Sequence, residues 1–500
     1  MRPVETKPNQ DKKADPRRIA DVLYRMLPSV NEILLTLPLA QLDFSNGQRE
    51  RVIEAVRRSL DGMRNEIAQG FHTSQSLENL LRELPASVAE KMNAGSEFSL
   101  RRVINATGVI LHTNLGRAPL SEVALDHLRE IAAGYSNLEF DLERGERGKR
   151  DSHVESLLLA LFVKSSSEPE QTQRAVIVNN CAAATFLALH ALARGREVLV
   201  SRSELIEIGG GFRIPEILEE SGALLREVGT TNRTRVSDYE RAITSETALI
   251  LRVHQSNFAM EGFVERAGLE ELIALGRRKG VGVFEDQGTG LVESLEPYGI
   301  RKETTIAGSL MSGCNLVAAS GDKLFGGPQC GILVGQTELI DRIRSNPLFR
   351  TFRADKLSYA ALEATLIQYL YGDPESLPVI RMLQMAEKTI RDRCAHIADS
   401  VHSAELTIQI VGVSSVIGGG TAPKSTLPSY AIALEHKSLD ATSLLAALRG
   451  LEPPIIGRID ENRVLLDLRT VEPEFDEFLI RTLSQQFASI LEVRAGDAAR

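Results

Sequence analysis

The spacing of apolar residues changes along the chain, from a helical pattern near the N-terminus to a strand pattern further on. From about residue 17 to residue 84, apolar positions recur every three or four residues, as on one face of a helix. Residues 1–16 are polar and rich in proline and charge, which predicts a mobile tail. We therefore expect a small helical module over residues 1–70 and a linker over residues 71–104.

Short β-branched or apolar runs alternate with helical segments from about residue 175 onward. This alternation predicts a seven-stranded, mostly parallel sheet with helices on both faces, in an α/β domain over residues 105–350. The last two runs are joined by a turn too short for a helical crossover, which predicts one antiparallel edge strand. The expected strands cover residues 175–178, 197–201, 224–228, 248–253, 281–285, 316–320 and 331–335, and the expected helices residues 182–193, 214–221, 236–243 and 269–279.

A third pattern follows the α/β region. It consists of long helical runs and then separate strand-like runs. The expected helices cover residues 357–371 and 378–404, and the expected strands residues 406–413, 430–434 and 464–468. We expect a smaller C-terminal α+β domain over residues 351–500.

Composition and charge narrow the class of protein. The net charge of −9 argues against a general nucleic-acid binder, although a local basic face remains compatible with it. The apolar runs are too short to cross a bilayer, and the N-terminus lacks the apolar core of a signal peptide. The four cysteines have neither metal-ligand spacing nor the pattern of a disulfide framework. We expect a soluble, cytoplasmic protein without a metal site.

Lys323 stands directly after an expected buried strand and opens a glycine-rich turn, in the sequence Ser320-Gly-Asp-Lys-Leu-Phe-Gly-Gly-Pro-Gln-Cys-Gly331. Lysines are seldom buried without a partner or a chemical role. The role typical of this position is a Schiff base with an aldehyde, above all pyridoxal 5'-phosphate. A turn lysine that reaches solvent is the alternative, and this segment alone does not separate the two.

Two further polar features follow expected strands, where α/β sheets bind ligands. The segment from Asn180 through Cys181 and Ala182 opens a helix, so its backbone amides are suited to a phosphate group, although an ordinary asparagine cap is the alternative. Asp286 is suited to pair with a protonated pyridine nitrogen, or else forms a local turn. Together with Lys323, these features appear in the order that an aminotransferase-type pyridoxal-phosphate enzyme needs. Ser320 completes the expected cofactor contacts.

Other candidate residues are a histidine and three arginines. His254 follows an expected strand, where it is placed to touch a bound ring or to pack in the core. Arg117 lies in a loop rich in hydrogen-bonding groups, and Arg350 and Arg353 lie three residues apart at the expected domain junction. Arginine binds phosphate and carboxylate through two parallel hydrogen bonds. A solvated charged surface is the alternative for each arginine.

Longer motifs resemble those of one family, the bacterial selenocysteine synthases, or L-seryl-tRNA(Sec) selenium transferases. The similarity runs from about Leu27 to Leu483. The motifs are Ile104-Asn-Ala-Thr-Gly-Val-Ile-Leu-His-Thr-Asn-Leu-Gly-Arg117, Tyr135-Ser-Asn-Leu-Glu139, Glu207-Ile-Gly-Gly210, Phe212-Arg-Ile-Pro215, Gly229-Thr-Thr-Asn-Arg233, Gly321-Asp-Lys-Leu-Phe-Gly-Gly-Pro-Gln329, Arg353-Ala-Asp-Lys356 and Pro454-Ile-Ile-Gly-Arg458.

The resemblance implies a pyridoxal-phosphate enzyme of fold type I that acts on seryl-tRNA(Sec). Lys323 would hold the cofactor, and loss of the serine hydroxyl would give a dehydroalanyl intermediate to which selenium from selenophosphate adds. The resemblance assigns the anionic selenium donor to Arg117, Arg350 and Arg353, and a catalytic role to Asp322. It also implies a ring-shaped homodecamer built from dimers, in which the N-terminal module binds the tRNA.

The chain departs from the family pattern at three positions. Cys181 stands where asparagine is common, Asp151 where tyrosine is usual, and Gln287 follows Asp286 where leucine is more frequent. Two other interpretations therefore stay open, a related lyase that acts on a free amino acid and a non-catalytic RNA-binding homologue. Deletion of residues 1–70 separates the first from a tRNA enzyme, and a spectrum without bound cofactor would favour the second.

Overall fold

The computed structural model divides the chain into two compact units, Met1–Arg101 and Arg102–Arg500. It describes residues 22–36, 48–68, 74–94, 98–163, 173–208, 211–255, 257–300, 303–419, 421 and 425–485. The tail expected over residues 1–16 lies outside these ranges. In the described part of the chain, no helix is both long and apolar enough to cross a membrane.

Among the described residues of the first unit, α2 (Val30–Thr36), α3 (Gln48–Ala68) and α4 (Ser74–Ala94) share one core. On α3, Val52, Val56, Leu60, Met63 and Ile67 are all buried, and their spacing of three or four residues places them on one face. Leu77, Leu84 and Val88 of α4 belong to the same apolar cluster. Much of the segment expected to be a linker is therefore a helix that completes this core.

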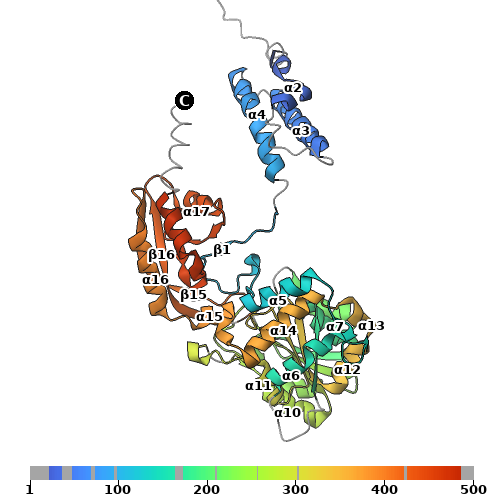
Figure 1. Cartoon of the computed structure of the whole chain (residues 1–500). Coiled ribbons are helices and arrows are strands. Elements are labelled where there is room, and N and C mark those ends of the chain that lie inside the picture. The colour runs from blue at the N-terminus through green and yellow to red at the C-terminus, as the bar shows by residue number, and fades with distance from the viewer. Residues whose placement is uncertain are drawn as a thin grey trace, which may run out of the picture. The chain divides into compact units, whose positions relative to one another are not determined.

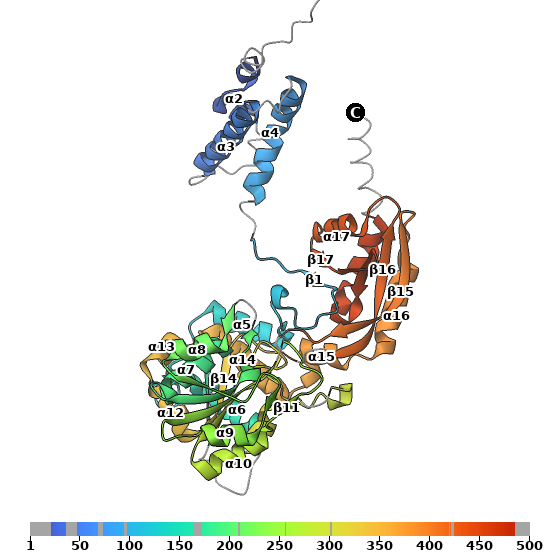
Figure 2. The same cartoon turned by 180° about the vertical axis from the view of Figure 1, so that it is seen from behind.

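The second unit is built around a seven-stranded sheet (Figures 1 and 2). Its strands, in spatial order, are β4 (Gln173–Val178), β14 (Gly331–Gln336), β13 (Leu316–Ser320), β12 (Gly282–Asp286), β10 (Thr247–Val253), β5 (Glu197–Ser201) and β8 (Leu224–Val228). All neighbouring pairs are parallel except the two that involve β14. The expectation of an antiparallel edge strand is wrong in position, because β4 pairs with the outer side of β14 and takes the edge.

Helices cover both faces of this sheet. One face packs against α7 (Cys181–Ala193), α8 (Ile214–Ser221) and α12 (Thr337–Ser345), and the other against α6 (Glu155–Phe162), α10 (Leu269–Lys279), α11 (Ile306–Met311) and α14 (Lys356–Tyr371). In β4, Ala175 and Ile177 point into one core while Val176 and Val178 point into the other. Burial on both faces explains why central strands such as β13 and β14 are almost continuously apolar in sequence.

The residues expected to form the smaller C-terminal domain contain a four-stranded antiparallel sheet. Its order is β15 (Leu406–Val416), β16 (Thr426–His436), β19 (Arg463–Asp467) and β18 (Arg458–Asp460), with α16 (Glu387–Ser400) and α17 (Ala441–Arg449) sharing one apolar core. The helix expected over residues 378–404 is two helices, α15 (Pro378–Gln384) and α16, because the chain turns at Met385. Helix α14 packs instead with α5 (Glu122–Ala133) and the core of the large sheet.

Candidate active site

A buried cavity of about 260 Å³ lies at the carboxyl ends of β10, β12 and β13, beside the N-terminus of α7. This is the edge of an open α/β sheet where ligands bind. Every residue that the sequence suggested as a cofactor contact lines this cavity. Of the five suggested catalytic residues, Lys323, Asp322 and Arg117 line it too. The lining residues are Arg117, Asn180, Cys181, Ala182, Val253, His254, Asp286, Gln287, Gly288, Ser320, Asp322, Lys323 and Gln329.

Lys323 lies three residues beyond β13 and is only 8% exposed. Its side chain therefore does not reach solvent as a turn lysine would. Burial lowers the pKa of Lys323 below the ordinary value of a lysine. A larger share of its amine is then unprotonated near neutral pH, which is the form that attacks an aldehyde.

Glycines let the turn around Lys323 pack closely. A Cβ on Gly290, which has a φ of +70°, would lie 2.2 Å from the carbonyl oxygen of Ser320. A Cβ on Gly321 would lie 2.5 Å from the sulfur of Cys330. Side chains at these two positions would displace the turn, so the glycines fix where Lys323 enters the cavity.

Asp286 is the last residue of β12, and its carboxyl group is buried. Thr185 on α7 donates a hydrogen bond to its Oδ2 at 3.0 Å, and the thiol of Cys181 lies 3.8 Å from its Oδ1. Burial raises the pKa of Asp286, although the Thr185 hydroxyl and the nearby Lys323 oppose the shift. A cation bound beside this carboxylate would offset the cost of burying its charge.

Asn180 caps α7, and its Oδ1 accepts a hydrogen bond from the backbone amide of Ala183 at 2.8 Å. The side chain thus acts as the ordinary cap that the sequence allowed. Cys181 and Ala182 follow in the first turn and line the cavity. Backbone amides in the first turn of a helix have no partner within the helix, and the helix dipole favours an anion there. The cap and a phosphate site are therefore compatible.

His254 follows β10, and its backbone amide donates to the carbonyl oxygen of Asp286 at 3.0 Å. Its Nε2 lies 2.8 Å from Oε2 of Glu303. The Nδ1 atom is buried, with no hydrogen-bond partner among the described residues. His254 also lines the cavity, so packing in the core does not account for all of its contacts.

Arg117 reaches the cavity from a loop far from Lys323 in sequence. Its Nη1 donates to Oδ2 of Asp322 at 2.8 Å, and Oδ1 of Asp322 accepts from the hydroxyl of Ser320 at 2.7 Å. The backbone of Arg117 has a φ of 62°, which is uncommon for a residue other than glycine. Arg117, Asp322 and Ser320 thus form one hydrogen-bonded chain beside Lys323.

Arg350 and Arg353 do not lie in this cavity. Arg350 is exposed on α13 (Pro347–Thr351), while Arg353 lies beyond the C-cap Phe352, so the two are not on the same helix. Arg353 pairs with Glu139 at 3.4 Å. It lines a separate cavity of about 250 Å³ that also contains Arg147, Lys149, Arg150 and Arg344.

Two of the three departures from the family pattern have a structural explanation. The buried Asp151 accepts a hydrogen bond from the Tyr359 hydroxyl at 2.7 Å and pairs with Arg344 at 3.3 Å. Gln287 donates through Nε2 to the carbonyl oxygen of Thr304 at 2.5 Å. Cys181, in contrast, lies in the cavity with Lys323, and burial raises the pKa of its thiol well above the ordinary value.

Sequence reasoning missed two residues of the site, Thr185 and Glu303. Thr185 lies inside α7, one turn beyond the capped end, and a threonine in a helix gives no functional signal by itself. Glu303 lies 49 residues after its partner His254. Only the fold brings Thr185 to Asp286 and Glu303 to His254, two residues that line the cavity.

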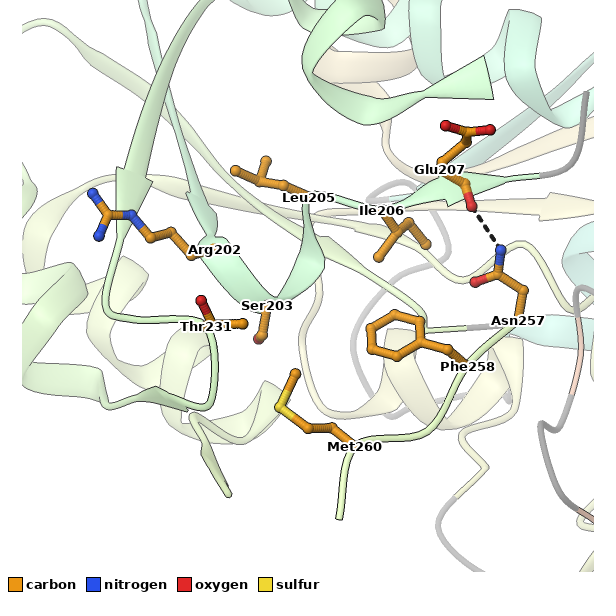
Figure 3. A pocket seen from close by; sticks show the side chains of 9 residues that line it. All are labelled: Arg202, Ser203, Leu205, Ile206, Glu207, Thr231, Asn257, Phe258 and Met260. Carbon is orange, nitrogen blue, oxygen red and sulfur yellow. Dashed lines mark hydrogen bonds between the residues drawn. The ribbon is translucent and has the colours of Figure 1, made fainter. Parts of the chain in front are cut away.

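Another cavity, of about 360 Å³, lies elsewhere in the large domain (Figure 3). Its lining includes Arg202 and Glu207 but no lysine, and Asn257 donates across it to the carbonyl oxygen of Glu207 at 2.6 Å. It therefore lacks the amine that an aldehyde cofactor requires. Within the described ranges, no group of three histidine, cysteine or acidic side chains is placed to bind a metal.

The cavity at Lys323 fits pyridoxal 5'-phosphate in its chemistry. It offers a buried amine with a lowered pKa, a buried carboxylate opposite to it in charge, a capped helix N-terminus and a histidine with a buried, unpaired Nδ1. These groups match, in turn, an aldehyde, a protonated ring nitrogen, a phosphate and a polar ring substituent or ring face.

Comparison with known proteins gives consistent matches. The family model "L-seryl-tRNA selenium transferase" (SelA) matches residues 103–472. The chain is 44% identical over 436 residues to an L-seryl-tRNA(Sec) selenium transferase of Aquifex aeolicus, covering 87% of this chain and 93% of that protein. It is 45% identical over 470 residues to the enzyme of the same name from Geobacter metallireducens, covering 92% and 99%.

The similarity to a solved structure of low sequence identity supports the fold but not the function. D-glucosaminate-6-phosphate ammonia-lyase superimposes with a TM-score of 0.54 at 18% sequence identity, covering 77% of this chain and 95% of that chain.

Proposed function

Because the chain belongs to the L-seryl-tRNA(Sec) selenium transferase family, we propose that the cavity around Lys323 is the active site of this transferase. The reaction converts L-seryl-tRNA(Sec) to L-selenocysteinyl-tRNA(Sec) and depends on pyridoxal 5'-phosphate. Its substrates are seryl-tRNA(Sec) and selenophosphate. Charged tRNA is a cytoplasmic molecule, so we expect the enzyme to act in the cytoplasm.

The cofactor, when bound, supplies an electron sink for the negative charge that develops at Cα of serine. Lys323 would hold the cofactor through its aldehyde carbon, and its amine is placed to take the α-proton of serine. The buried carboxylate of Asp286 would keep the ring nitrogen protonated. The first turn of α7 would hold the phosphate, and His254, whose Nε2 lies beside Glu303, would contact the ring.

The observation that carries this proposal is the joint burial of Lys323 and Asp286 in one cavity at the strand ends. The test is a visible absorbance spectrum of purified protein together with turnover of seryl-tRNA(Sec) and selenophosphate. Lys323→Ala should abolish both the cofactor band and turnover. If purified Lys323→Ala keeps the visible cofactor band, the proposed role of Lys323 is wrong.

We further propose that Arg350 and Arg353 bind the selenium donor in the active site of a second copy of the chain. What supports this is their cationic character, the exposure of Arg350 and the separation of both from the cavity of their own chain. An active site of this kind requires at least a dimer. The ring-shaped decamer implied by the resemblance stays an expectation that light scattering can measure.

Mixing two inactive variants tests this arrangement. Lys323→Ala lacks the amine, and the double variant Arg350→Ala with Arg353→Ala lacks the donor site. If sites are shared between copies, reassembled mixtures regain activity because some sites combine an intact lysine with intact arginines. Mixtures that stay inactive, while each variant reassembles normally with wild-type chains, would contradict the shared site.

We propose that the N-terminal unit binds the tRNA. Its helix α3 exposes Arg57, Arg58 and Arg64, which are suited to phosphate contacts. Removal of residues 1–101 follows the boundary between the two units. The truncated protein should keep the cofactor band but lose turnover of seryl-tRNA(Sec). Unchanged turnover would instead favour a lyase that acts on a free amino acid.

A further inference from the structure

One segment connects the C-terminal domain to the active site, and we call residues 104–117 the strap. The strap begins with β1 (Ile104–Asn105), which pairs in parallel with β17 (Ile455–Ile456) of the C-terminal domain. It ends at Arg117, which donates to Asp322 in the cavity of Lys323. The strap thus touches the C-terminal domain at one end and the proposed donor site at the other.

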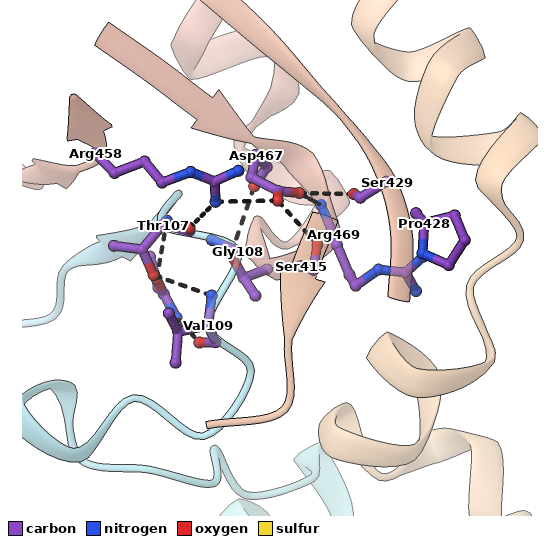
Figure 4. Close-up of polar contacts among 11 residues, drawn as sticks. Thr107, Gly108, Val109, Ser415, Pro428, Ser429, Arg458, Asp467 and Arg469 are labelled. Carbon is purple, nitrogen blue, oxygen red and sulfur yellow. Dashed lines mark hydrogen bonds and ion pairs between the residues drawn. The ribbon is translucent and has the colours of Figure 1, made fainter. Parts of the chain in front are cut away.

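The anchor at the first end is a buried carboxylate, Asp467, with no exposed surface (Figure 4). The hydroxyls of Ser415 and Ser429 each donate to it at 2.8 Å, and the backbone amide of Arg469 donates at 3.2 Å. Nη1 of Arg458 lies 3.3 Å from Oδ2 of the same carboxylate. These donors use both carboxylate oxygens and hold Asp467 in one orientation.

The strap backbone packs directly on this anchor. Arg458 also donates through Nη1 to the carbonyl oxygen of Thr107. Gly108 has a φ of +76°, and a Cβ there would lie 2.1 Å from Oδ2 of Asp467 and 2.6 Å from Nη1 of Arg458. Its amide donates to Oγ1 of Thr470 at 3.1 Å. The strap is therefore in register with Asp467 only while glycine occupies position 108 and Arg458 is present.

Backbone hydrogen bonds carry the register onward along the strap. The amide of Val416 donates to the carbonyl of Gly108 at 2.9 Å, and the amides of Ile110 and Leu111 donate to residues 416 and 417 at 3.0 and 2.7 Å. Leu111 is fully buried. Only a short turn then separates Leu111 from Arg117, so a shift of the strap at its anchor moves the guanidinium at its end.

We propose that Asp467 and Arg458 are positioning residues that act on the donor step through Arg117. This rests on the proposed function and on the role in binding the anionic selenium donor that the family resemblance implies for Arg117. Neither Asp467 nor Arg458 lines the cavity of Lys323. They fix the strap, and the strap aims Arg117 at the place where the donor binds.

A double-mutant cycle tests the coupling, because residues that act in series are not additive. The variants are Arg458→Ala, Arg117→Ala and the two combined, in cofactor-loaded full-length protein. One readout is the KM for selenophosphate, and the other is binding of inorganic phosphate measured by calorimetry. Arg458→Ala should weaken both about tenfold in the parent and have little further effect when Arg117 is already alanine.

Two controls separate positioning from general damage. Arg463→Ala removes a cation from the same strand region, paired with Glu461 at 2.9 Å and away from the strap, and should leave both readouts unchanged. Arg458→Lys keeps a donor for Thr107 and Asp467 and should restore most of the loss. The cofactor band and the melting temperature report whether each variant is folded.

Different outcomes test whether Arg458 acts through Arg117 and whether Arg117 binds the donor at all. An Arg458→Ala effect of equal size with and without Arg117 would mean that Arg458 does not act through Arg117, and the inference would be wrong. Normal phosphate binding by Arg117→Ala would instead refute the donor role of Arg117 itself. If Arg458→Ala does not fold, Gly108→Ala displaces the same backbone and is measured in its place, with the same expected dependence on Arg117.

Discussion

Two buried aspartates end strands in this protein, and their surroundings differ. Asp467, at the end of β19, is held by two hydroxyls, a backbone amide and an arginine. Asp286, at the end of β12, has one hydroxyl at 3.0 Å and a thiol at 3.8 Å. Loss of a buried carboxylate that its own chain satisfies leaves its partners unpaired, whereas a buried carboxylate with few donors among the described residues is suited to a cationic ligand. The comparison separates an anchor from a binding site.

The largest expected effect is on stability, at Asp467. Asp467→Ala leaves Arg458 and two buried hydroxyls without their partner, so it should lower the free energy of unfolding by about 3–5 kcal/mol. Chemical denaturation measures this loss. A loss below about 1 kcal/mol would mean that the hydrogen bonds to Asp467 do not hold the C-terminal domain, and the contrast with Asp286 would fail.

Replacement of Asp286 should instead reduce activity without reducing stability. Asp286→Asn should lower kcat by about a hundredfold or more, since the ring nitrogen loses its anionic partner. The cofactor-free protein should be no less stable than the parent at pH 7. Folding raises the pKa of Asp286, so its charged form costs stability above the unfolded-state pKa, and asparagine removes that cost. Steady-state kinetics and thermal unfolding of both proteins measure the two effects.

The lowered pKa of Lys323 predicts a pH dependence of cofactor uptake. The unprotonated amine reacts with the aldehyde, so the rate at which cofactor-free protein regains the visible band should rise with pH. It should level off below the pKa of an ordinary lysine, which is near 10.5. Stopped-flow absorbance measures the midpoint. A midpoint at or above the ordinary value would contradict the effect of burial.

The smallest expected effect concerns the thiol beside Asp286. Cys181→Asn introduces the residue common in the family and adds a better hydrogen-bond donor near that carboxylate. Cofactor affinity should rise by less than about tenfold, within the range of one added hydrogen bond. Equilibrium titration with pyridoxal 5'-phosphate measures the change. Matched Cys394→Ala, at a buried cysteine in the core of the C-terminal domain, should leave the affinity unchanged.

The sequence alone predicted the large domain closely because most strands there are buried on both faces, although the edge strand β8 is mostly exposed. The expected strands over residues 197–201, 224–228 and 316–320 coincide with β5, β8 and β13. The order of strands was less predictable, since pairing of β14 with β4 depends on contacts between residues far apart in the chain. Local spacing carries no signal for such contacts.

In the site, too, residues with a local sequence pattern were predicted and residues that depend on distant contacts were not. Lys323, Asp286 and Asn180 were found because each follows a recognisable strand. Glu303 was missed because no pattern in its own segment points to His254. The distance of Arg350 and Arg353 from the cavity could not be foreseen either, because sequence spacing does not tell whether a residue serves its own chain or another.

The pairing of β1 with β17 has a consequence for the order in which the protein becomes functional. The strap is synthesised early, but its partner strand leaves the ribosome roughly 350 residues later. At about 5–20 residues per second, the delay is on the order of 20–70 s. Until then, the large domain can fold around Lys323, and Arg117 has its bond to Asp322 but not the anchor at the other end of the strap. On this order of synthesis, the nascent chain can form its cofactor site before the C-terminal domain fixes the strap.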